Sequence, residues 1–118
     1  MFTIAKQFDF AASHIIEGVP PDHPCGRLHG HNYRVELILK ATQLNAIGFV
    51  VDYRDLKPFK EIIDHELDHR HLNDVLPGST SAEAIAQYLY QRAKALWPEV
   101  AAVRVSETPK TWAEYTEL

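Results

Sequence analysis

The fold is decided by two segments, FTIAKQFDFAASH at residues 2–14 and HNYRVELILKA at residues 31–41. In the first, the apolar residues share one parity, broken only by Lys6, and in the second they alternate with mostly polar residues in the same way. An alternation with a period of two is typical of strands that bury one face. We expect these strands to pair antiparallel, because a parallel pair requires a structured crossover of a dozen or more residues.

The connection between these strands is EGVPPDHPCGR, residues 17–27. Its three prolines and two glycines are incompatible with a helix or a central strand, so it is predicted to be a loop. Loops that are held by a rigid scaffold often carry functional side chains.

Two helices are expected after these strands. The first has Asp52 as its predicted N-cap and apolar residues at near-helical spacing. Pro58 leaves open whether a single turn precedes a break or the main helix begins at this proline. A T-x-x-E capping box at Thr80 and Glu83 predicts the start of the second helix, and Pro98 ends it.

The remaining extended segments are short. Residues 48–51 are predicted to be a short strand or extended piece, and strands are expected at 100–106 and at roughly 112–116. The resulting antiparallel four-stranded sheet, with its helices segregated between two pairs of strands, defines an α+β fold. Exposed sheet edges favour pairing with another subunit, so a homo-oligomer is expected.

Length and composition limit the classes of function. The chain has 118 residues, which fits one domain over 1–118. A net charge of −4 argues against nucleic acid as a partner, and no apolar run is long enough for a membrane helix. The single cysteine excludes an internal disulfide. The N-terminal residues lack the features of a signal peptide, so the expected location is the cytoplasm.

Histidine is the residue type that suggests chemistry, with seven in the chain. His29 and His31 form an H-x-H pair, which on a strand points both rings to one face with Cα atoms about 6.6 Å apart. Strand parity places His14 on the matching face of the partner strand. Three neutral histidines with an open fourth position match a catalytic zinc site, and three ordinary histidines without a metal are the alternative on these grounds.

Cys25 has three interpretations from the sequence alone. It could be a fourth zinc ligand in a closed structural site, an inert small apolar residue, or a reactive thiol. Its position in a loop rich in proline and glycine disfavours the inert interpretation. The other two interpretations stay open on these grounds.

The second histidine cluster is LDHRHLND, residues 67–74. Asp68 beside His69 is compatible with an oriented acid–base pair or with a polar helix exit. His65 and His71 have no evident partner and are expected to face solvent. Glu107 follows the parity of the strand at 100–106 and is a candidate for an inward carboxylate that binds the N–H groups of a heterocycle.

These segments resemble the 6-pyruvoyltetrahydropterin synthase superfamily. The resemblance covers nearly the whole chain and keeps the order of the family's motifs. The segments that carry it are FDFAASH at 8–14, CGRLHGHNY at 25–33, VVDYRDLK at 50–57, LDHRHLND at 67–74, TSAEAIA at 80–86 and VSETPKTWAEY at 105–115.

The resemblance implies a fold and a set of roles. The expected fold is the tunnelling fold (T-fold), an antiparallel four-stranded sheet with two helices on one face, assembled as a hexamer with active sites between subunits. His14, His29 and His31 are implied to bind Zn²⁺. Cys25, Asp68 and His69 are implied to be catalytic, and Glu107 is implied to bind the pterin ring. Cys25 and the Asp68–His69 pair are expected to come from different chains of the oligomer.

The implied reaction is that of a carbon–carbon lyase of queuosine biosynthesis. The short Cys-x₃-His-x-His spacing favours this branch, in which 7,8-dihydroneopterin triphosphate yields 6-carboxytetrahydropterin, acetaldehyde and triphosphate. One alternative is elimination of triphosphate without side-chain cleavage, and another is a zinc-stabilised binding protein without catalysis. Arg27 and Lys110 are candidates for triphosphate binding on charge alone.

Overall fold

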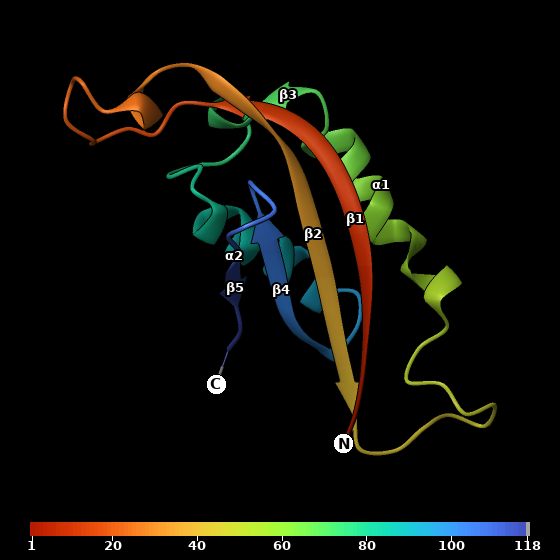
Figure 1. Cartoon of the computed structure of the whole chain (residues 1–118). Coiled ribbons are helices and arrows are strands. Elements are labelled where there is room, and N and C mark those ends of the chain that lie inside the picture. The colour runs from red at the N-terminus through yellow and green to blue at the C-terminus, as the bar shows by residue number, and fades with distance from the viewer. Residues whose placement is uncertain (118) are drawn as a thin grey trace.

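A long antiparallel hairpin organises the molecule (Figure 1). In the computed structural model, which describes residues 1–117, β1 spans Phe2–His14 and β2 spans His29–Ala41. Their register is continuous, from Phe2 opposite Ala41 to His14 opposite His29. The alternation in the sequence therefore predicts the pairing and orientation of these strands correctly, including the extension of β1 to His14.

Three further strands complete a mixed sheet of order β3-β1-β2-β4-β5. β4 spans Val100–Ser106 and pairs antiparallel with β2, and β5 spans Ala113–Tyr115 beside β4. β3 spans only Arg70–His71 and runs parallel to β1. The expected sheet of four antiparallel strands is thus corrected to five strands. Two residues are too few for any periodic signal, which is why the sequence does not predict β3.

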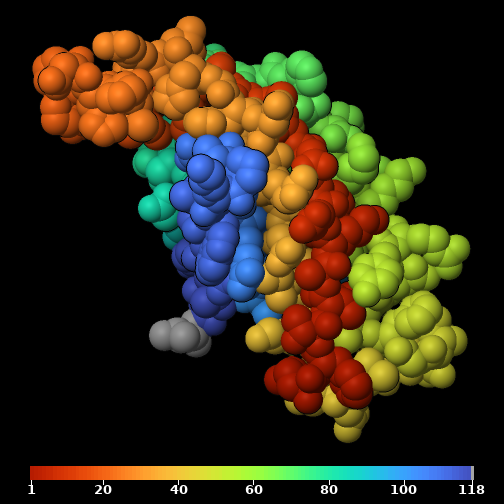
Figure 2. Space-filling view, viewed as in Figure 1, coloured from red at the N-terminus to blue at the C-terminus, as the bar shows by residue number. Residues whose placement is uncertain are grey.

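Both helices cover one face of the sheet. α1 spans Lys57–Glu66 and α2 spans Ala82–Lys94. The core between layers includes Phe8 and Leu37 from the hairpin with Phe59 and Leu89 from the helices, all buried. Figure 2 shows the opposite side, where β1, β2 and β4 lie next to one another without a covering helix.

The start of α1 combines the two alternatives left open by Pro58. The Asp52 side chain accepts from the Arg54 N–H and caps a 3₁₀ turn at Tyr53–Leu56. α1 follows without a gap, with Pro58 in its first turn, where its missing N–H costs no helical hydrogen bond. Residues 48–51, by contrast, form bends and no strand.

The predicted capping box of the second helix is wrong. Ser81 is the N-cap of α2, and its hydroxyl accepts from the Ala84 N–H. Thr80 is buried instead, and its hydroxyl donates to the Ile15 carbonyl at 3.3 Å. A local motif cannot distinguish two adjacent hydroxyl residues when one of them bonds to a residue that is distant in the sequence.

The topology brings His14, at the end of β1, next to the start of β2. The loop at 15–28 projects beyond this end of the sheet (Figure 1). Among residues 1–117, no helix has the length and hydropathy needed to cross a bilayer.

Candidate metal centre and active site

Three imidazole rings converge where β1 ends and β2 begins. Their ring centroids are 4.5 Å apart for His14 and His29, 5.2 Å for His14 and His31, and 5.0 Å for His29 and His31. One nitrogen from each ring lies within 4.8 Å of the other two, so the three side chains could hold one metal ion. Facing strand positions and the H-x-H spacing produce this convergence.

Backbone carbonyls orient two of the rings. His14 Nδ1 lies 2.8 Å from the Thr80 carbonyl oxygen, and His29 Nδ1 lies 2.7 Å from the Arg27 carbonyl oxygen. A carbonyl only accepts, so each Nδ1 carries the proton and donates. The two Nε2 atoms therefore keep their lone pairs, as metal-ligating histidines require.

The environment of the third ring, His31, shows whether the site suits a cation. His31 Nε2 is buried and has no hydrogen-bond partner among the described residues. Glu107 Oε2 is 3.1 Å away, but it lies off the direction in which an N–H at Nε2 would donate. A buried nitrogen without a partner is costly, and a bound cation would remove that cost. The donor set of three imidazoles fits zinc and related divalent metals.

Burial keeps the deepest of these rings neutral. The His14 side chain is fully buried, and this desolvation lowers its pKa, although its hydrogen bond to the Thr80 carbonyl acts in the opposite direction. Burial likewise raises the pKa of Tyr33, whose hydroxyl lies 3.3 Å from His14 Nδ1. Neutral imidazole is the form that binds a metal, so burial favours ligation by His14.

Asp68 and His69 form a second candidate group of site residues at the edge of the sheet. Asp68 Oδ2 lies 3.0 Å from His69 Nδ1, while Asp68 Oδ1 accepts from the Ala11 N–H at 2.9 Å. The His69 side chain is 82% exposed, and its backbone has a positive φ of 58°. A non-glycine residue in this left-handed conformation is strained, and such strain is concentrated at functional sites.

One cavity connects the two groups. It has a volume of about 850 Å³, and its lining includes His31, Asp68, His69 and Glu107. The structure thus brings one metal-site histidine, the Asp68–His69 pair and Glu107 to a common space. Glu107 follows directly after β4 and points toward His31, as the parity of that strand predicts.

Cys25 lies apart from this cavity within the part of the chain that the structure describes. It is in the 3₁₀ turn at Pro24–Gly26, half-buried, and its backbone N–H donates to His23 Nδ1. It is neither in the three-histidine cluster nor in the lining of the cavity, again among residues 1–117.

Other partners at the site are not predicted by the sequence. The carbonyl groups of Arg27 and Thr80 leave no signal in residue type, so only the structure reveals them. His71, expected to face solvent, is half-buried instead, and its Nδ1 lies 3.0 Å from the Ser13 hydroxyl oxygen. That expectation is wrong because β3, which pairs His71 with Ser13, was not predicted.

The fold and the site define a class of protein, an α+β chain in which three histidines that could hold a metal ion lie beside a cavity that contains carboxylates. Residues 3–118 match the sequence profile of the 6-pyruvoyl tetrahydropterin synthase family. The chain belongs to this family.

Curated relatives cover nearly the whole chain. A 6-carboxy-5,6,7,8-tetrahydropterin synthase of Synechocystis is 34% identical over 98% of this chain and 93% of its own length. A protein of Haemophilus influenzae with the same name is 28% identical over 99% of this chain and 100% of its own length.

Solved structures confirm the T-fold. The 6-pyruvoyl tetrahydropterin synthase of Caenorhabditis elegans superimposes with a TM-score of 0.87 at 23% identity, over 99% of this chain and 96% of that one. An uncharacterized protein of Wolinella succinogenes gives a TM-score of 0.85 at 25% identity, over 99% of this chain and 98% of that one.

Proposed function

We propose that this protein is a 6-carboxy-5,6,7,8-tetrahydropterin synthase that acts in queuosine biosynthesis in the cytoplasm. The substrate would be 7,8-dihydroneopterin triphosphate, and the products would be 6-carboxytetrahydropterin, acetaldehyde and triphosphate. The observation that carries this proposal is the convergence of His14, His29 and His31 beside a cavity that also contains Asp68, His69 and Glu107. The names of the curated relatives support it.

In this proposal the three histidines hold Zn²⁺. Bound there, the metal would supply Lewis acidity toward the hydroxyl groups of the substrate side chain. The hydrogen bonds from His14 and His29 to backbone carbonyls hold those rings in one tautomer and one orientation.

The Asp68–His69 pair is proposed to move protons. The Asp68 carboxylate is fixed by the Ala11 N–H, and it in turn orients His69 through Nδ1. His69 Nε2 is then the atom that exchanges protons with the side-chain oxygens of the substrate. The high exposure of this ring and its position in the lining of the cavity support this role.

Glu107 is proposed to bind the pterin ring. Its carboxylate accepts hydrogen bonds from the amino and ring N–H groups, and such charge-assisted contacts are stronger than those between neutral groups. Its position beside His31 would place the reacting side chain of the pterin near the metal centre.

Cys25 is proposed to act as the thiolate that removes a carbon-bound proton. Since Cys25 lies outside the cavity of its own chain, we propose that it serves the site of a neighbouring subunit. The protein would then be a homo-oligomer, with a hexamer built from two trimers as the expected form, and each site would combine residues of different chains.

The experiment that tests this function is incubation of the zinc-loaded protein with 7,8-dihydroneopterin triphosphate, followed by mass analysis. We expect 6-carboxytetrahydropterin and acetaldehyde in equal amounts. Release of triphosphate without acetaldehyde would instead identify a 6-pyruvoyltetrahydropterin synthase activity. Binding of the substrate without any product would identify a zinc-stabilised binding protein.

A further inference from the structure

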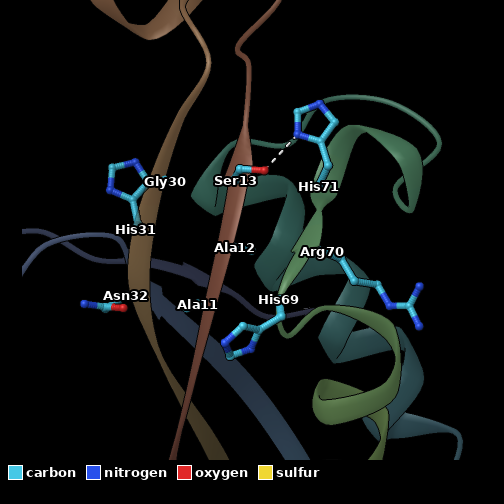
Figure 3. A pocket seen from close by; sticks show the side chains of 9 residues that line it. All are labelled: Ala11, Ala12, Ser13, Gly30, His31, Asn32, His69, Arg70 and His71. Carbon is cyan, nitrogen blue, oxygen red and sulfur yellow. Dashed lines mark hydrogen bonds between the residues drawn. The ribbon is translucent and has the colours of Figure 1, made fainter.

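A second, shallower cavity lies over the junction of β1 and β3 (Figure 3). Its volume is about 520 Å³, and Ser13, Asn32, His69 and His71 are among the side chains that line it. None of the described residues in its lining is an aspartate or a glutamate. Its polar side chains can all donate hydrogen bonds, so the cavity suits an anion.

The Ser13–His71 pair is the built element of this cavity. Figure 3 shows the contact between Ser13 Oγ and His71 Nδ1, which are 3.0 Å apart. If the hydroxyl donates to Nδ1, then His71 Nε2 carries a free N–H; if Nδ1 donates, the hydroxyl hydrogen is free. In either arrangement one donor remains available to a ligand.

The two cavities are continuous and have opposite character. His31, Asn32 and His69 line both of them. The larger cavity contains the carboxylates of Asp9, Asp68 and Glu107, and its guanidinium, that of Arg34, is paired with Asp9 at 3.6 Å. The smaller cavity has no carboxylate in its described lining. A ligand that spans both would therefore place its N–H donors at one end and its anionic groups at the other.

We propose that the Ser13–His71 pair, with Asn32, binds the triphosphate tail of the substrate while Glu107 binds its ring. This inference rests on the proposed function. In a chain with a net charge of −4, a polyanionic tail requires a local surface free of carboxylates. The Ser13–His71 pair on adjacent strands, with its one remaining donor, and the Asn32 amide provide such a surface.

The basic residues near the site are less suitable. Arg70 precedes His71 on β3, but its guanidinium extends away from Ser13 and Asn32 (Figure 3). Neither Arg27 nor Lys110, the candidates on charge alone, is among the described residues that line the two cavities.

The test is titration calorimetry of the zinc-loaded protein with inorganic tripolyphosphate, which needs no turnover. His71→Asn keeps an atom that can bond Ser13 but lacks Nε2, and we expect it to weaken binding about tenfold or more. The matched control is His65→Asn, on the exposed face of α1, which should bind like wild type. Ser13→Ala removes the other half of the pair and should also weaken binding.

A second measurement separates the tail from the ring. For His71→Asn, the KM for 7,8-dihydroneopterin triphosphate should rise by a similar factor, while inhibition by unphosphorylated 7,8-dihydroneopterin should be unchanged. If His71→Asn weakened the binding of both pterins equally, the inference would be overturned. Undetectable tripolyphosphate binding, or binding that neither Ser13→Ala nor His71→Asn changes, would also overturn it. If these substitutions weakened tripolyphosphate binding but the wild-type protein did not turn over the pterin substrate, the inference would be supported and the proposed function refuted.

Discussion

His14 connects the metal centre to the interior of the fold. It is fully buried and donates to the Thr80 carbonyl, so the ring that would bind the metal also bridges β1 and the segment before α2. His29 makes a similar bond to the Arg27 carbonyl, but only two residues away and in a more exposed position. The two ligands therefore differ in their contribution to stability.

This difference gives a paired prediction. His14→Gln and His29→Gln should each abolish high-affinity metal binding, measured by chelator competition. In metal-free protein, His14→Gln should lower the free energy of unfolding by about 1–3 kcal/mol, because it disturbs a buried hydrogen bond. His29→Gln should lower it by less, as measured by urea unfolding. An equal loss of stability in both variants would contradict this account.

Cys25 gives a second prediction. It is not part of the three-histidine cluster in the described chain, so Cys25→Ala should abolish turnover and still bind one metal ion per site. Metal content by atomic absorption and product formation by mass analysis measure the two effects. Cys25→Ala protein that loses its metal would favour the closed structural site with a fourth, sulfur ligand.

At the scale of the elements, hydrogen bonds to β1 fix β3 and the Asp68–His69 pair before it at the edge of the sheet. The His69 N–H donates to the Ala11 carbonyl, and the Asp68 carboxylate accepts from the Ala11 N–H. β1 thus holds both neighbouring residues through the backbone N–H and carbonyl groups of a single residue, Ala11. Such a clamp can stabilise the positive φ of His69, which is otherwise unfavourable.

The strain at His69 is testable with two substitutions. His69→Gly and His69→Ala both remove the imidazole and should both abolish turnover. The glycine variant should be more stable than the alanine variant by about 1 kcal/mol, because a left-handed φ costs little without a Cβ. Denaturant unfolding provides the comparison. An alanine variant that is as stable as the glycine variant would show that the backbone there is not strained.

The Asp68 clamp predicts a dependence of stability on pH. The hydrogen bond from the Ala11 N–H lowers the pKa of Asp68 below its ordinary value, and His69 adds to this effect. Such a carboxylate stabilises the fold above its unfolded-state pKa, near 3.8, and loses this contribution as pH falls through the folded-state value. Between about pH 5 and pH 2, the free energy of unfolding, measured with urea, should therefore decrease less for Asp68→Asn than for wild type. If the free energies of unfolding of the two proteins fell equally with pH, the prediction would be contradicted.

At the scale of the whole molecule, the residues of the proposed active site lie in two separate places on one chain. His31, His69 and Glu107 share a cavity, while Cys25 lies in the projecting loop outside it among the described residues. The outer edge of β1 pairs with β3 only at its end, at Ala12 and Ser13, so most of this edge is available to another sheet. Both observations favour an assembly in which chains complete one another.

Complementation tests this assembly. Cys25→Ala and His69→Ala proteins, each inactive alone, should recover a measurable fraction of wild-type activity when they are refolded together. Recovery is expected because some sites of a mixed oligomer would receive both native groups. Native mass spectrometry identifies the mixed oligomers. Mixed oligomers that stay inactive would show that both groups act within one chain.

The sequence by itself determined the main hairpin, the presence of the two helices and the side of the hairpin on which the three clustered histidines lie. A period of two over thirteen residues leaves only one face for the core. This excludes registers of β1 against β2 that are shifted by an odd number of residues, and it fixes the side on which His14 and His31 lie. Asp52 is likewise predictable as a cap, because its partner is two residues away.

Only the tertiary structure decided what depends on contacts between distant segments. β3 has two residues and forms because β1 offers an edge to pair with. Thr80 is buried where its hydroxyl donates to the carbonyl of Ile15, the residue directly after β1. The partnership of His71 with Ser13 follows from that pairing across 58 positions. Residue type and local spacing describe a segment's own preferences, whereas these features arise from neighbours that the folded chain alone brings together.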